Sequence, residues 1–114
     1  FLADIISIHV PLNNETKYLF DKKTFQKMNN KPIIINSSRG GIINETDILE
    51  AYKNNYISGF ALDVYEHEPV NKIFLKNITN DMNCILSPHI AGVTEESNTR
   101  VSEFIMNKTN EFFF

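Results

Sequence analysis

The sequence has 114 residues, about one small domain, and its 42% hydrophobic and 22% charged residues are ordinary for a globular protein. A net charge of -3 without any basic cluster argues against a nucleic-acid partner. No apolar run approaches the roughly 20 residues that a membrane span needs, and the first residues lack the basic region of a secretory signal. We therefore expect a cytoplasmic protein without membrane contact.

The first half of the chain alternates apolar runs with helical patterns. The β-branched run at residues 5–10 predicts a buried strand, and a short helix is expected around residues 21–28 with Asp21 as its N-cap. Residues 32–35 form the next apolar run, which predicts a second strand. A helix is predicted over residues 44–55, capped by Asn44, with Asp47 three residues on resembling a capping box.

The second half continues this alternation. Residues 59–64 and 84–87 predict two further strands, and the polar stretch 66–83 between them is expected to be mostly loop. From Thr94 onward, apolar residues at helical spacing predict a longer amphipathic helix. Short continuous apolar strands alternating with helices predict an α/β fold built on a parallel sheet with both faces covered.

Several polar residues follow directly after the predicted strands. Arg39 follows the second strand, Asp63 and Glu68 follow the third, and His89 follows the fourth. Because open α/β sheets bind ligands outside the carboxyl ends of their strands, these side chains are expected at one common edge.

Each of these residues also has an ordinary structural interpretation. His89 after a proline could be a surface or capping residue, Glu68 could be solvated, and Arg39 could form a structural ion pair with Glu68. Together, however, they supply what the reduction of a carbonyl in an anionic substrate requires. Arginine binds the carboxylate, histidine moves the proton, and a carboxylate hydrogen-bonded to histidine stabilises its charged form.

Three motifs carry a family resemblance. In order and spacing, "NSSRGG", "DVYEHEP" and "SPHIAG" with their flanking residues resemble the second half of the NAD-binding domain of D-isomer-specific 2-hydroxyacid dehydrogenases, a group that includes D-3-phosphoglycerate, glycerate and formate dehydrogenases. The resemblance covers essentially the whole chain. It implies that residues 1–114 are the C-terminal part of a dinucleotide-binding domain, within a Rossmann-type doubly wound parallel sheet with flanking helices.

The resemblance also implies roles for individual residues. Arg39, Glu68 and His89 match the catalytic set of the family. The implied cofactor contacts are His9, Val10, Pro11, Ser38, Asp63 and His89, with Asp63 meeting the nicotinamide carboxamide. His67 falls at a variable family position and is expected to be solvated, and no metal site is expected.

The resemblance further implies NAD as cofactor, with NADP not excluded, and a small 2-hydroxy acid or 2-oxo acid of the phosphoglycerate, glycerate or hydroxypyruvate type as substrate. Family members are usually homodimers. The chain contains no G-x-G-x-x-G fingerprint for pyrophosphate binding. We therefore expect it to be part of a longer dehydrogenase and to be inactive alone. Two alternatives stay open: an inactive truncated product that acts at most as an interaction remnant, and a corepressor-like protein that senses NAD(H).

Overall fold

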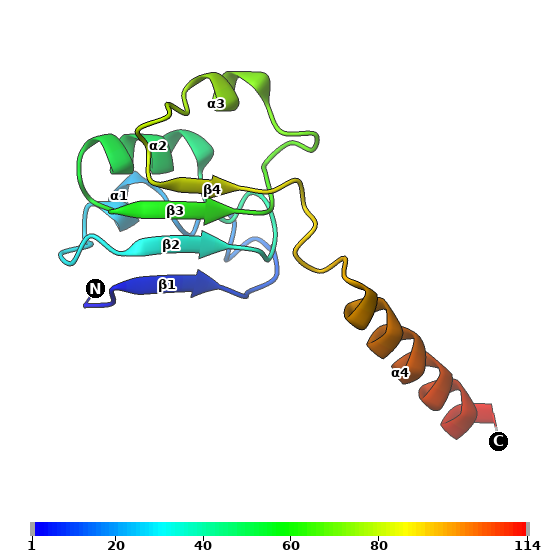
Figure 1. The fold of residues 1–114 in the computed structure, drawn as a ribbon. Coiled ribbons are helices and arrows are strands. Elements are labelled where there is room, and N and C mark those ends of the chain that lie inside the picture. The colour runs from blue at the N-terminus through cyan, green and yellow to red at the C-terminus, as the bar shows by residue number, and fades with distance from the viewer. Residues whose placement is uncertain (1, 114) are drawn as a thin grey trace.

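The computed structural model describes residues 2–113 and is built on a four-stranded parallel sheet. Its strands are β1 (Ile5–Ile8), β2 (Ile33–Asn36), β3 (Gly59–Leu62) and β4 (Cys84–Leu86), and they lie side by side in chain order (Figure 1). Four helices accompany them: α1 (Lys22–Phe25), α2 (Glu45–Lys53), α3 (Lys72–Lys76) and α4 (Glu95–Phe113).

The strands end at the same level. Ile8 lies opposite Asn36, Asn36 opposite Leu62, and Leu62 opposite Leu86. Since all strands are parallel, the residue that follows each of these four leaves the sheet at one edge. This alignment assembles the candidate site.

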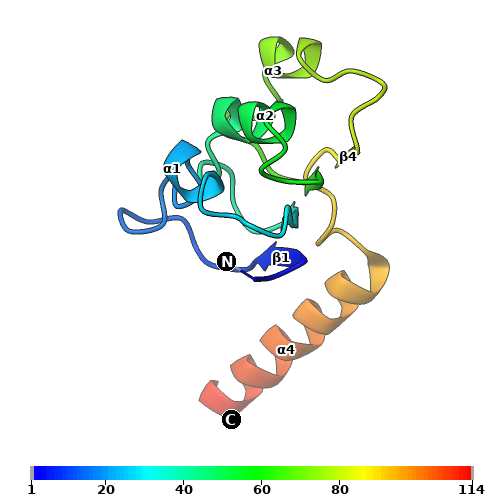
Figure 2. The ribbon, with the colours of Figure 1, turned by 90° about the vertical axis from the view of Figure 1, so that its left-hand side faces the viewer.

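The order of the strands decides where the helices lie. Parallel strands are joined by right-handed crossovers, so a sheet that grows steadily in one direction receives its helices on one face. Figure 2 shows α1, α2 and α3 together on one side of the sheet. On the opposite face, Ile5 and Ile85 are largely exposed. Helices on both faces require a reversal of strand order, and residues 2–113 contain no such reversal.

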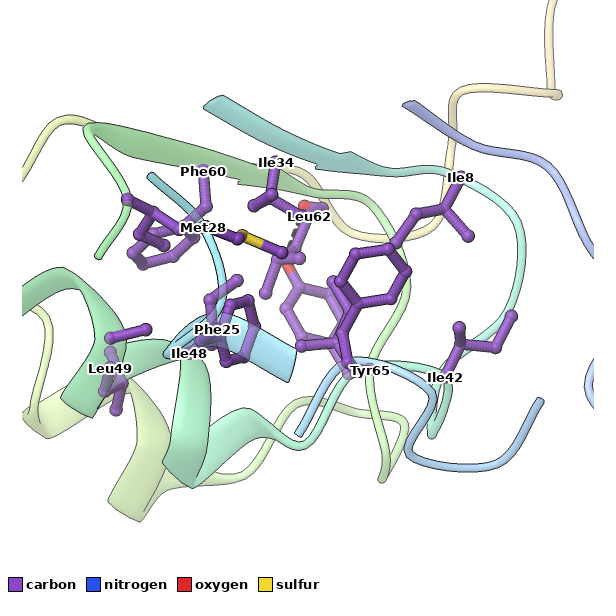
Figure 3. Packing of buried hydrophobic residues seen from close by; sticks show 14 of the residues in the cluster. Ile8, Phe25, Met28, Ile34, Ile42, Ile48, Leu49, Phe60, Leu62 and Tyr65 are labelled. Atoms are coloured by element: carbon purple, nitrogen blue, oxygen red, sulfur yellow. Dashed lines mark hydrogen bonds between the residues drawn. The ribbon is translucent and has the colours of Figure 1, made fainter. Parts of the chain in front are cut away.

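The core fills the space between the sheet and these three helices (Figure 3). Alternate strand residues such as Ile34 and Phe60 point toward the helices, because side chains alternate between the two faces of a strand. Phe25 from α1 and Ile48 from α2 meet them and are fully buried. Burial of apolar surface of this kind contributes about 25 cal/mol per Å² to stability.

The two predicted N-caps are confirmed. Asp21 accepts a hydrogen bond from the Thr24 N–H, and Asn44 accepts one from the Asp47 N–H. The predicted capping box at Asn44 is wrong in part, because the Asp47 side chain does not accept from the Asn44 N–H in return. The Asp47 carboxylate accepts instead from the backbone N–H of Lys22, 2.8 Å away, and so joins α2 to the start of α1.

Two segments differ from the expected pattern. The stretch 66–83 contains the short helix α3, which Asn71 caps by accepting from the Ile73 N–H. The long helix α4 forms as predicted, but it leads away from the sheet and none of its described residues is buried (Figure 1). No helix formed by residues 2–113 combines the length and the apolar character that a membrane crossing needs.

Candidate active site

The predicted site residues gather where the four strands end. His9 follows β1, Ser38 and Arg39 lie in the loop after β2, Asp63 follows β3, and His89 lies in the loop after β4. Their side chains differ in burial, since Asp63 is buried whereas His9, Arg39 and His89 are exposed.

Buried Asn36 shapes the loop that carries Arg39. Its amide nitrogen donates to the Arg39 carbonyl oxygen at 3.0 Å, and its amide oxygen accepts from the Ser38 N–H and hydroxyl. The Arg39 guanidinium donates to the Ser38 carbonyl oxygen at 2.7 Å and has no ion pair within residues 2–113. The proposed structural pair between Arg39 and Glu68 is therefore wrong, and the guanidinium keeps further donors for an anion.

A cavity of about 400 Å³ lies beside this loop. It is lined by His9, Val10, Pro11, Ser37, Ser38 and Arg39. The His9 Nε2 is 2.7 Å from the hydroxyl oxygen of Ser7, a residue of β1.

Glu68 and His89 form a contact pair. Glu68 Oε2 lies 2.7 Å from His89 Nδ1, and Glu68 Oε1 accepts from the Tyr65 N–H at 3.2 Å. The hydrogen bond with His89, and secondarily that from Tyr65, lowers the pKa of the Glu68 carboxyl. An ionised carboxylate can only accept, so Nδ1 carries the hydrogen of this contact and Nε2 is the nitrogen left to face a substrate.

Asp63 holds the loop in which His89 lies. The residue is 6% exposed, and its carboxylate accepts from the Ser87 hydroxyl and from the backbone N–H groups of Ile90 and Ala91. Burial by itself raises the pKa of the Asp63 carboxyl, but these hydrogen bonds together outweigh it, so the pKa is lowered.

Tyr65 connects the three predicted catalytic loops. Its hydroxyl donates to the Ser87 carbonyl oxygen at 2.8 Å, and its N–H donates to Glu68. Its carbonyl oxygen packs against Gly40, where an added Cβ would lie only 1.7 Å away. The residue after Arg39 must therefore lack a side chain for the two loops to approach this closely.

The structure joins some predicted residues and separates others. Glu68 and His89 border a cavity of about 180 Å³ together with Tyr65, Pro69, Val70 and Pro88, whereas Arg39 lines the separate cavity beside His9. His67 is exposed, as expected. A larger cavity, about 650 Å³, lies at the amino ends of the strands, and none of the predicted site residues lines it.

No role in the site was predicted from the sequence for Asn36, Tyr65 and Ser87. Asn36 and Ser87 could be recognised in the sequence as polar residues at the ends of apolar runs. Tyr65 lies within the DVYEHEP motif, but the resemblance assigned it no role. Among residues 2–113, no group of three or more His, Cys, Asp or Glu side chains is placed to hold a metal ion.

A parallel sheet with crossover helices and polar loops at its carboxyl edge defines part of a Rossmann-type dinucleotide-binding fold. Residues 2–91 match the family model described as "D-isomer specific 2-hydroxyacid dehydrogenase, NAD binding domain". The chain therefore belongs to the D-isomer specific 2-hydroxyacid dehydrogenase family, and the family model identifies its fold as an NAD-binding domain.

Individual relatives agree with this assignment. The chain is 38% identical to an (S)-sulfolactate dehydrogenase from Chromohalobacter salexigens over 88% of its own length and 32% of that protein. It is 38% identical to D-3-phosphoglycerate dehydrogenase from Bacillus subtilis over 96% of its length and 20% of that protein. A crystal structure of D-lactate dehydrogenase with NAD+ from Lactobacillus jensenii superposes with a TM-score of 0.80 at 31% identity, over 92% of this chain and 35% of that one. The chain thus spans about a third or less of these relatives.

Proposed function

We propose that this chain is the C-terminal part of the dinucleotide-binding domain of an enzyme that transfers a hydride between NAD(H) and a small 2-hydroxy acid or 2-oxo acid. The observation that carries the proposal is the contact between Glu68 and His89 at the carboxyl edge of the sheet. Arg39, in the loop after β2, has no ion pair with any of residues 2–113. A carboxylate that orients an imidazole is the arrangement expected of a proton-transferring histidine.

His89 is proposed to move the proton. Glu68 accepts from Nδ1, so Nε2 can donate a proton to the carbonyl oxygen during reduction or remove one from the hydroxyl during oxidation. The ionised Glu68 stabilises the positive charge that the imidazole carries before it donates. In the direction of reduction, the 2-oxo acid gains one hydride at C2 and one proton at its oxygen, which gives the 2-hydroxy acid.

Arg39 is proposed to bind the carboxylate of the substrate. One guanidinium nitrogen is held by the Ser38 carbonyl oxygen, which orients the planar group, and the exposed remainder can bind two oxygens at once. Asn36 fixes the loop after β2 by its hydrogen bonds to Ser38 and Arg39.

The cavity beside His9, Val10 and Pro11 is proposed to take the nicotinamide end of the cofactor, which supplies the hydride when bound. It lies at the carboxyl ends of two neighbouring parallel strands, the usual position of a dinucleotide in this fold. No glycine-rich loop in these residues could hold the pyrophosphate. We therefore propose that a preceding segment completes the site. We also propose that the complete protein is cytoplasmic and, from the resemblance alone, a homodimer.

The deciding experiment is an assay of the protein extended by the segment encoded upstream in the same reading frame. NADH oxidation is measured with hydroxypyruvate, 3-phosphohydroxypyruvate, glyoxylate and pyruvate. We expect turnover of at least one 2-oxo acid, and a loss of kcat of about 100- to 10,000-fold in His89→Ala, as for a removed general acid.

His67→Ala is the matched control, because His67 is an exposed histidine in the neighbouring loop. This variant should retain its turnover. Binding of NADH without turnover of any of the four acids would favour a sensing protein over an enzyme. Full turnover by His89→Ala would exclude the proposed role of His89.

A further inference from the structure

The Asp63 carboxylate binds both sides of the loop that presents His89. Its Oδ1 accepts from the Ser87 hydroxyl at 2.6 Å and from the Ile90 N–H at 2.9 Å, and its Oδ2 accepts from the Ala91 N–H at 2.9 Å. These donors precede and follow His89 in the chain. A single carboxylate therefore binds the loop on both sides of His89.

The backbone of His89 needs such a support. Its φ angle is 58°, in the left-handed region that residues with a Cβ rarely adopt. An unfavourable backbone conformation persists where the surrounding structure holds it in place. The side chain of His89 is 46% exposed, so packing of the ring does little to fix it. The hydrogen bonds to Asp63 constrain the backbone on both sides of His89.

We propose that Asp63 is a positioning residue, whose carboxylate holds the loop of residues 87–91 in the one conformation that brings the His89 imidazole to Glu68. This inference rests on the proposed function of His89. It differs from the role that the family resemblance implies for Asp63, a direct contact to the nicotinamide carboxamide. Most of the accepting capacity of the carboxylate is already used inside the protein, because Oδ1 accepts two hydrogen bonds and Oδ2 accepts one.

Replacement of the carboxylate by an amide tests this role with little change in shape. In Asp63→Asn one of the two oxygens becomes an NH₂ group, which faces the backbone N–H of Ile90 in one orientation of the amide and that of Ala91 in the other. Two facing donors cannot form a hydrogen bond, so at least one of the three contacts is lost. Ser87→Ala is the milder second variant, because it removes only the hydroxyl contact to Oδ1.

The first measurement does not depend on activity. Amide hydrogen exchange of Ile90 and Ala91 is followed by NMR in the complete protein, with and without the substitution. We expect exchange at one or both amides to accelerate by about 10- to 100-fold in Asp63→Asn, the range expected for one lost charge-assisted hydrogen bond. A smaller acceleration is expected in Ser87→Ala.

The second measurement separates positioning from cofactor contact. In Asp63→Asn we expect kcat for a 2-oxo acid to fall by about 10- to 100-fold while the Kd for NADH changes by less than about threefold. Asp47→Asn is the matched control, because the Asp47 carboxylate also accepts a backbone N–H, that of Lys22, but far from the strand ends. It should leave both amide exchange at Ile90 and Ala91 and kcat unchanged.

Weakened NADH binding, with amide exchange and kcat as in the wild type, would overturn the inference in favour of a direct cofactor contact. Unchanged exchange at both amides would also overturn it. A wild-type protein that turns over no 2-oxo acid would instead refute the proposed function, and the exchange data would still decide whether Asp63 holds the loop.

Discussion

The carboxylate of Glu68 and the imidazole of His89 are in contact, with 2.7 Å between Oε2 and Nδ1, although the residues belong to loops that follow different strands. Glu68→Gln keeps the shape of the side chain but replaces an ionised acceptor by a neutral amide. We expect kcat to fall by about 10- to 100-fold, because the amide stabilises the charged imidazole less well. The KM for the 2-oxo acid should change little, since Arg39 is proposed to bind it. Steady-state kinetics of the complete protein checks both values.

The same pair predicts a dependence of stability on pH. The pKa of Glu68 is lowered, first by its hydrogen bond with His89 and then by the one from Tyr65. The stabilisation by Glu68 is therefore present above the ordinary glutamate pKa of about 4.3 and is lost as the pH falls through the lowered value. Both side chains are at least 40% exposed, so the effect is small. Urea unfolding of wild type and Glu68→Gln should give free energies that converge on acidification, and a difference that grows instead would contradict the assignment.

Arg39→Lys should impair substrate binding more than turnover. The guanidinium is oriented by its 2.7 Å hydrogen bond to the Ser38 carbonyl oxygen, and a lysine ammonium cannot bind the two oxygens of a carboxylate with a planar fork. We expect KM for the 2-oxo acid to rise by about 10- to 100-fold, equivalent to the loss of one charged hydrogen bond. Arg100→Lys on α4 provides the control and should leave KM as in the wild type. If the two lysine variants have the same KM, Arg39 does not bind the substrate.

Gly40→Ala tests the close approach between two predicted catalytic loops. The added Cβ would lie 1.7 Å from the Tyr65 carbonyl oxygen, so the backbone must shift. Overpacking of this kind costs about 1–3 kcal/mol or more, and we expect a loss of that size in the free energy of unfolding. Gly92→Ala is the control, because nothing lies within 4 Å of the Cβ it would add. Equal stability of the two variants would mean that the loops can separate without cost.

The positions of Arg39, Asp63 and His89 at one edge could be predicted because they depend on strand direction alone. Apolar runs gave the strands, and parallel strands that end in register deliver the following residues to a common edge. A contact between a carboxylate and His89 was expected from the residue types that converge at the strand ends, and the family resemblance assigned Glu68 to the catalytic set. The contact depends on the course of a long loop, and local sequence does not determine that course.

The other differences between the predicted and the observed fold also depend on information that local sequence does not contain. The helix α3 was missed because its five residues are too few to show helical periodicity, although Asn71 is an ordinary N-cap. Helices were expected on both faces of the sheet because parallel sheets are generally covered on both faces. The one-sided arrangement follows from a strand order that only the three-dimensional pairing reveals. The support of the His89 loop by Asp63 likewise depends on tertiary contacts.

Glu45 is buried at the start of α2, where the residue is 8% exposed. Its Oε1 accepts from the Glu66 N–H at 2.6 Å, and Glu66 in return accepts from the Glu45 N–H at 2.7 Å. Burial raises the pKa of Glu45, and the negative charge of Glu66 adds to this effect, while the hydrogen bond from the Glu66 N–H opposes it. The helix amino terminus also favours a negative charge, but the net direction is upward.

A raised pKa means that folding favours the protonated acid. The resulting stabilisation is present below the ordinary glutamate pKa of about 4.3 and is lost as the pH rises through the raised value. Glu45→Gln keeps an oxygen that can accept from the Glu66 N–H and carries no charge, so its contribution should not change over this pH window. We therefore expect the variant to be at least as stable as the wild type at neutral pH, by urea unfolding across the window. Glu103→Gln, at an exposed glutamate of α4, is the control and should stay within about 0.5 kcal/mol of the wild type. If Glu45→Gln is clearly less stable than the wild type at neutral pH, the ionised carboxylate stabilises this helix start, and the raised pKa is wrong.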